Sequence, residues 1–279
     1  MLFLNGLLFL AIILDQRLRQ RKELVMFLGL SLSYIILALG MTIAGIYRTY
    51  LSLSGKLTAL RPQLQCFFAP HNLLLITANT VCNLMWFLMG VDRLVAVCWP
   101  LCYYGLTAIY SWRLVLLAYL YTMAQSTIAL ALLLWEDQKH LVSPLCSAWD
   151  AVTSEFWWFQ STLSGVLLQA SIVLYILVLL IYKKKQTQVG LWGPAAANEA
   201  ARQRRMTITM SFSCLLTFCF GVMPATILSR IDSISHTVVG YGLGLASIID
   251  ASVNFFLLLN RHQELRQAIT ALVRCRTVA

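Results

Sequence analysis

Long stretches without charge constrain this chain more than any other feature. Residues 67–91 contain no Asp, Glu, Lys or Arg, and they are followed at once by Asp92 and Arg93. Over the whole chain 59% of residues are hydrophobic and only 11% are charged, against about 25% charged in ordinary soluble domains. Because a helix of roughly 20 apolar residues crosses a bilayer core, we expect an all-α membrane protein.

Seven segments are expected to cross the membrane and to form one seven-helix domain over residues 1–279. They are residues 1–14, 24–47, 67–93, 113–135, 156–182, 205–229 and 237–259. The first segment is short. No basic residue precedes it and no small-residue cleavage site follows, so it is unlike a signal peptide, and we interpret it as the inner half of a truncated first helix. A short amphipathic helix is expected at 261–275.

Residues 94–112 also lack charge, so hydropathy alone would allow an eighth span. This segment contains Pro100, Gly105, three tyrosines and two tryptophans. Amphipathic aromatic rings are typical of the headgroup boundary. We therefore expect residues 94–112 to form an inner loop.

The basic residues predict the orientation of the bundle. Of the 21 Lys and Arg residues, 16 fall within 15–22, 93–113, 183–205 and 261–276, and basic residues concentrate on the cytoplasmic side of a membrane. The amino terminus is then expected outside and the carboxyl terminus in the cytoplasm. The net charge of +10 is mostly an orientation signal, and no nucleic acid is expected as a partner.

The cysteines agree with this orientation. A helix from Cys66 to Arg93 would be about 40 Å long at 1.5 Å per residue, close to the thickness of a bilayer with its headgroups. Cys66 is therefore expected at the outer face, and Cys146 lies in a loop on the same oxidising side, where a disulfide forms and persists. The other cysteines are expected to be buried apolar residues, except for Cys275, which follows the last span and is a candidate for acylation.

The stretch "DRLVAVCWPLCY" at 92–103 resembles the rhodopsin-like (class A) G-protein-coupled receptors. It follows their pattern Asp-Arg-Tyr-x-Ala-Val-x-x-Pro-Leu-x-Tyr at the third helix and second inner loop, with Leu94 in the first tyrosine slot. That leucine, together with "GIYR" at 45–48, is most similar to the nematode serpentine chemosensory receptors. The resemblance covers nearly the whole chain, and it also matches Cys66 and Cys146 to the family's outer disulfide.

The resemblance implies a receptor that binds an extracellular ligand and activates a heterotrimeric G protein from the plasma membrane. The coupling switch would comprise Asp92, Arg93, Pro100 and Tyr182, and Pro224 would kink the sixth helix. Asp92 would hold Arg93 at rest, and outward movement of the sixth helix would free it. The simpler alternatives are an Arg93 that only anchors the helix at the headgroups and a tolerated membrane proline.

Several family positions are changed here. The second-helix acid, which helps to hold a sodium ion in the family, aligns with Tyr34. The tryptophan before the sixth-helix proline is Val222, and the proline and tyrosine of the seventh-helix motif are Phe255 and Leu258. The acid at the foot of the sixth helix is Arg204, which excludes a clamp to Arg93 and predicts higher basal activity. Since these are the moving parts, a decayed receptor that no longer signals is an alternative.

Polar residues inside the spans mark a further set of candidates. Asn5 fits the polar residue of the family's first helix, and Asn254 begins the end of the seventh. Asp250 is the one carboxylate deep in a span, and intramembrane acids are functional hypotheses by default. A structural acid that is hydrogen-bonded to Tyr34 or to a backbone carbonyl is the alternative.

The ligand pocket is expected between the third, fifth, sixth and seventh helices near the outer face. Helical spacing from Arg93 and Pro224 places there His71, Leu75, Asn79, Thr226, Ser229, Gly244 and Ile248. Leu75 occupies the slot of the carboxylate in monoamine receptors, which argues against a biogenic amine. An odorant-like small molecule or a peptide fits this lining. His71 has no second ligand at suitable spacing, so no metal site and no cofactor are expected.

Two other classes of membrane protein fit the sequence less well. A small-solute transporter would show inverted repeats and helices broken at the midplane, which are not apparent in the sequence. An intramembrane enzyme needs paired catalytic groups, and Asp250 has no such partner, so catalysis is not expected.

Overall fold

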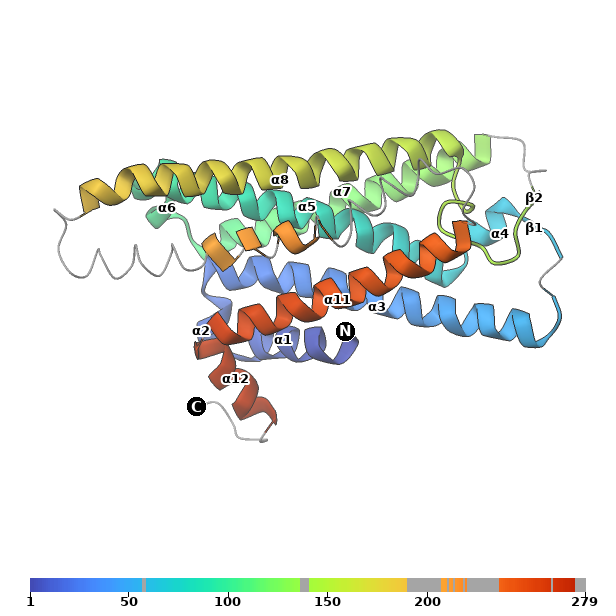
Figure 1. Cartoon of the computed structure of the whole chain (residues 1–279), viewed down its shortest axis with the longest axis horizontal. Helices are drawn as coiled ribbons and strands as arrows, with labels where there is room; N and C mark the ends of the chain where they lie inside the picture. The colour runs from blue at the N-terminus through green and yellow to red at the C-terminus, as the bar shows by residue number, and fades with distance from the viewer. Residues whose placement is uncertain are drawn as a thin grey trace.

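The computed structural model describes an all-α membrane protein (Figure 1). The described residues are 1–56, 59–135, 141–189, 207–209, 211–212, 214–217, 219, 236–261 and 263–273. Pro224, Thr226, Ser229 and Cys275 lie outside them, as does most of the predicted span 205–229. Gly244 and Asp250 are described only as part of a helix.

Four of the described helices are long and apolar enough to cross a membrane. They are α3 (Lys22–Leu53), α5 (Pro70–Cys98), α7 (Ala108–Trp135) and α8 (Ser154–Val189). The shortest of them has 28 residues, which gives about 42 Å of helix, enough for a bilayer with its headgroups. Three of the predicted segments, 24–47, 113–135 and 156–182, each lie within one of these helices.

Shorter elements complete the described chain. They are α1 (Leu2–Leu14), α2 (Gln16–Arg19), β1 (Arg61–Pro62), α4 (Gln63–Phe67), α6 (Pro100–Gly105), β2 (Leu141–Val142), α11 (His236–Arg261) and α12 (Gln263–Val273). α11 contains the predicted span 237–259. α12 lies within the predicted amphipathic helix, and its buried Leu265, Ala268 and Ile269 fall on one helical face.

α5 lies at the centre of the long helices and packs against α3, α7 and α8 (Figure 1). α3 and α7 approach closely at Gly29, where an added Cβ would lie 2.9 Å from a Val115 methyl carbon. Tyr119 of α7 donates a hydrogen bond to the Gly29 carbonyl at 3.0 Å. α1 packs against α3, α11 and α12, and its stripe of Asn5, Leu8, Ala11 and Ile12 is buried.

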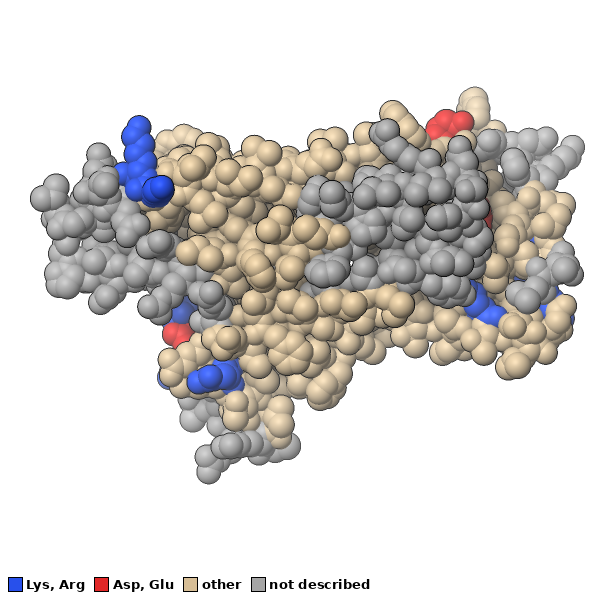
Figure 2. All heavy atoms as spheres, viewed as in Figure 1, with Lys and Arg blue, Asp and Glu red and all other residues tan. Residues whose placement is uncertain are grey.

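The surface separates into charged ends and an apolar middle. Figure 2 shows charged side chains near the two ends of the visible face and none across the described surface between them. α7 and α8 expose large apolar residues along their length, among them Leu116, Leu120, Val166 and Val173. This distribution is the one expected of a multi-pass protein whose waist lies in hydrocarbon.

The structure differs from the expected elements at three places. The helix expected from residue 67 begins at Pro70, because proline suits the first helical turn, and Cys66 lies in the separate helix α4. The two-stranded antiparallel sheet of β1 and β2 was not predicted, since two-residue strands carry no periodic signal. Residues 94–112 do not form an eighth spanning helix, but most of this expected loop is helical: α5 continues to Cys98, α6 covers Pro100–Gly105 and α7 begins at Ala108.

Candidate functional site

An ion pair is buried in the carboxyl-terminal part of α5. Arg93 Nε donates a hydrogen bond to Asp92 Oδ2 at 3.1 Å, and Arg93 Nη2 also pairs with that oxygen. Each of the two residues is only 1% exposed. A buried ion pair is tolerated when further hydrogen bonds satisfy its members, and removing one partner leaves an uncompensated charge.

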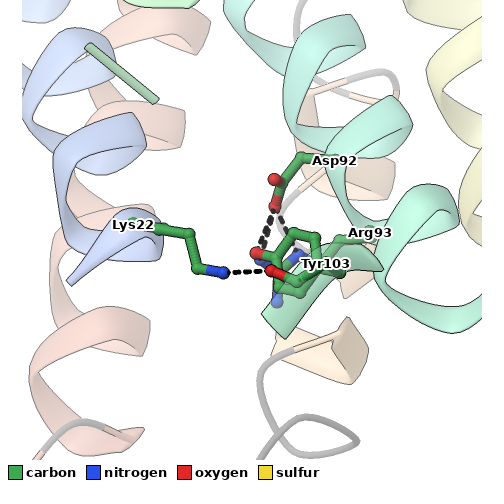
Figure 3. Close-up of polar contacts among 4 residues, drawn as sticks. All are labelled: Lys22, Asp92, Arg93 and Tyr103. Carbon is green, nitrogen blue, oxygen red and sulfur yellow. Dashed lines mark hydrogen bonds and ion pairs between the residues drawn. The ribbon is translucent and has the colours of Figure 1, made fainter. Parts of the chain in front are cut away.

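Tyr103 supplies these further bonds (Figure 3). Its hydroxyl accepts from Arg93 Nη2 at 2.8 Å and donates to Asp92 Oδ2 at 3.2 Å. Burial raises the pKa of the Tyr103 phenol above its ordinary value, so the hydroxyl keeps the proton that it donates. Asp92, Arg93 and Tyr103 form a closed set of hydrogen bonds, which we call the arginine cluster.

The turn after α5 brings Tyr103 back to Arg93. Trp99 breaks the helix with φ −125° and ψ 65°, and Pro100 is the first residue of α6. The Tyr103 amide then donates to the Trp99 carbonyl at 2.9 Å. Pro100, predicted as part of the switch, therefore starts the short helix that carries Tyr103.

Lys22, the first residue of α3, contacts the same tyrosine. Its Nζ donates to the Tyr103 carbonyl at 2.5 Å and lies 3.9 Å from the centroid of the Tyr103 ring. Figure 3 shows the lysine reaching from α3 across to α6. From the sequence, Lys22 has no predicted role beyond its positive charge. Tyr103 is recognisable there only as the last tyrosine of the 92–103 motif. The motif could therefore have indicated a role for Tyr103. Nothing in the sequence predicts that Lys22 contacts it.

A second arrangement of polar residues lies at the opposite, amino-terminal end of α5, which is the end predicted to face outward. Cys66 and Cys146 form a disulfide with a Cα–Cα distance of 5.1 Å, which confirms the expected pairing. Asn72 Nδ2 donates to the carbonyl of Cys66 at 2.7 Å and to that of Cys146 at 3.0 Å. The backbone of both half-cystines is thus held by one side chain of α5.

The same loop is held by two aromatic rings. His71 Nε2 lies 3.2 Å from the Cys146 carbonyl, and the His71 ring lies 5.1 Å from that of Tyr47. The Tyr47 hydroxyl donates to the Pro144 carbonyl at 3.1 Å. Nearby, the β1–β2 pair joins the two outer loops. Together with the disulfide, these contacts form an outer cover over the ends of α3 and α5.

Comparison with known families decides the class of this protein. The family described as serpentine type 7TM GPCR chemoreceptor Srsx matches residues 2–273. The chain belongs to this family. No curated protein matches the chain.

Membership confirms the resemblance read from "DRLVAVCWPLCY" and the all-α membrane fold. It makes the chain a chemoreceptor-type, multi-pass membrane protein. The arginine cluster of this receptor is built on that same stretch.

The predicted pocket residues of the receptor are not all brought together. His71 is 1% exposed and contacts the outer cover, so it is a packing residue and not an open pocket lining. Leu75 is partly buried against the core beside Gly40. Asn79 is exposed on α5, and Ile248 is exposed on α11.

The intramembrane polar residues have partners that only the fold reveals. Asn254 Nδ2 donates to the hydroxyl of Tyr34 at 3.2 Å, and both residues are buried. This bond links α11 to α3. Asn5 Nδ2 donates to the carbonyl of Met1, the residue that precedes α1, at 3.1 Å. Tyr182 lies in the inner part of α8.

Proposed function

We propose that this receptor binds an extracellular odorant-like small molecule or peptide and activates a heterotrimeric G protein at its cytoplasmic face. It would act in the plasma membrane with its amino terminus outside and its carboxyl terminus inside. The uneven distribution of Lys and Arg between the predicted inner and outer loops supports this orientation.

The arginine cluster is the observation that carries the coupling proposal. Arg93 is fully buried among Asp92 and Tyr103 at the end of α5, so in this arrangement its guanidinium is not available to a partner. Opening of the bundle would break these bonds and expose the guanidinium to the tail of a G protein. A charge-pair exchange of this kind is a means of biasing a bistable helix bundle.

The ligand would bind on the outer side of the bundle, below the outer cover. Leu75 and Asn79 of α5, Gly244 and Ile248 of α11, and Thr226 and Ser229 of the sixth span are the proposed lining. This lining is mostly apolar with a few polar tips. It suits a weakly polar ligand and, through Leu75, disfavours a biogenic amine.

The test uses basal nucleotide exchange, so it needs no identified ligand. Tyr103→Phe removes two hydrogen bonds to charged groups, each contributing roughly 1.5–3 kcal/mol, and should raise basal GTP exchange on purified G proteins about tenfold or more. Adding Arg93→Ala to that variant should abolish the gain, because the exposed arginine is the coupling group. Tyr50→Phe, an exposed tyrosine at the outer end of α3, is the matched control and should exchange like the wild type.

Three results would count against the proposal. Equal exchange in Tyr103→Phe and in the double variant would mean that Arg93 is only an anchor. Absence of exchange in wild type and Tyr103→Phe alike, across several G-protein classes and with correctly folded protein, would favour a receptor that no longer signals. Solute uptake by vesicles that contain the receptor would favour the transporter alternative.

A further inference from the structure

A groove lies between α7 and α8 on the apolar surface of the bundle. Each of these helices packs against α5, and the space between them has a volume of about 390 Å³. Small-molecule sites typically fall at about 300–1,000 Å³. The lining includes Tyr121, Gln125, Ile128 and Leu132 of α7 and Glu155 and Phe159 of α8.

The groove runs along one face of α7. Its α7 residues recur at helical spacing over 11 residues, which is about 16 Å. Ile128 and Phe159 are exposed and therefore face the hydrocarbon in a membrane. The groove is separate from the proposed ligand pocket, because none of the residues proposed for that pocket lines it. Its occupant would enter from the bilayer.

Gln125 is the unusual residue of this groove. Its side chain is 5% exposed, and within the described parts of the chain neither its Nε2 nor its Oε1 has a hydrogen-bond partner. The neighbouring Thr122 satisfies its own hydroxyl by donating to the Ala118 carbonyl at 2.9 Å. An amide without partners is costly where water is absent, so Gln125 requires a group that both donates and accepts.

The remaining lining restricts the charge of that group. No Lys or Arg lines the groove, and Glu155 stands at its outer end. A carboxylate or phosphate would be repelled there and would find no cation. A quaternary ammonium could not donate a hydrogen bond to Gln125 Oε1. A hydroxyl is uncharged and offers both a donor and an acceptor.

We propose that the α7–α8 groove binds a lipophilic alcohol dissolved in the bilayer. Its hydroxyl would donate to Gln125 Oε1 and accept from Gln125 Nε2, and its chain would lie along Ile128, Leu132 and Phe159. This site is additional to the proposed receptor function and does not depend on G-protein coupling.

Photolabelling of the full-length receptor in lipid nanodiscs tests this site. The probes are decanol carrying a diazirine and the matched diazirine decane, which lacks the hydroxyl. The alcohol should label the segments around Ile128 and Phe159 at least about fivefold more than the alkane, since one net hydrogen bond alone accounts for a factor of this order and the hydroxyl would make two. Gln125→Leu should reduce labelling by the alcohol to that of the alkane, while labelling by the alkane stays unchanged.

Two further variants make the test specific. Gln160→Leu removes an equally buried glutamine that donates to Thr80 at 3.0 Å and does not line the groove, so labelling should persist. Ile128→Trp fills the groove without touching the amide and should also reduce labelling by the alcohol. Equal labelling by alcohol and alkane in the wild type, or unchanged labelling of Gln125→Leu by the alcohol, would overturn the proposal.

Discussion

Lys22 and Tyr103 join the start of α3 to the short helix α6. The lysine donates to the tyrosine carbonyl and places its ammonium 3.9 Å from the ring centroid, while the tyrosine hydroxyl bonds to Asp92 and Arg93. The arginine cluster is thus attached to a second transmembrane helix. A substitution of Lys22 should therefore weaken the hydrogen bonds that hold Arg93. This effect would be transmitted through Tyr103 and requires no direct contact between Lys22 and Arg93.

We expect Lys22→Met to raise basal nucleotide exchange about two- to fivefold, less than Tyr103→Phe does. Methionine keeps most of the aliphatic stem but loses the hydrogen bond and the cation–π contact, which contributes about 0.5–2 kcal/mol. Basal GTP exchange on purified G proteins is the measurement. Lys56→Met, a change at an exposed residue of the first outer loop, is the control. A Lys22→Met receptor with wild-type exchange would show that α6 is held by the arginine cluster alone.

The disulfide should be a main source of stability at the outer end. It closes a loop with a sequence separation of 80 residues, for which loss of a native disulfide costs about 2–5 kcal/mol. Cys66→Ser should lower the melting temperature of the purified receptor and reduce its delivery to the cell surface. Detection of Cys66 and Cys146 as free thiols in folded wild-type protein would contradict this prediction.

Asn72 should contribute to stability independently of the covalent bond. Asn72→Ala removes hydrogen bonds to the carbonyls of both half-cystines, and we expect a loss of about 1–3 kcal/mol with the disulfide still formed. Thermal unfolding, with the disulfide verified by mass spectrometry, is the measurement. Asn79→Ala lies on the same helix at an exposed position and should change stability by less than about 0.5 kcal/mol. If the two substitutions change the free energy of unfolding equally, the hydrogen bonds of Asn72 do not stabilise the outer cover.

Sodium should not regulate this receptor. By resemblance, Tyr34 aligns with the second-helix acid of the rhodopsin-like receptors. It carries no charge at neutral pH, and its hydroxyl accepts a hydrogen bond from Asn254. We expect basal exchange to be unchanged when sodium is replaced by N-methylglucamine at fixed ionic strength. An increase on removal of sodium, absent in Asp250→Asn, would show that the acid has been relocated to the seventh span.

The sequence alone determined those features that depend on local composition. A run of apolar residues spans a membrane whatever its neighbours are. The segments predicted for α3, α7 and α8 therefore lie inside the observed helices. The Asp92–Arg93 pair was recognisable because its members are adjacent in the chain and in register with Pro100. The pairing of Cys66 with Cys146 followed from the side of the membrane assigned to each, since only these two were expected in the outer region.

The tertiary structure decided which distant side chains meet. Lys22 reaches Tyr103 and Asn254 reaches Tyr34 because helix packing sets the distance and rotation of each face, and no local pattern encodes either quantity. Packing likewise decided the surroundings of His71, which was predicted to line the pocket but contacts the outer cover. It also placed Gln125 in the lining of a groove, whereas in the sequence Gln125 is one of several polar residues in a mostly apolar helix. The composition of each segment thus determines whether it becomes a helix of the membrane bundle. The polar contacts inside the bundle depend on the relative placement of helices, which is established only on folding.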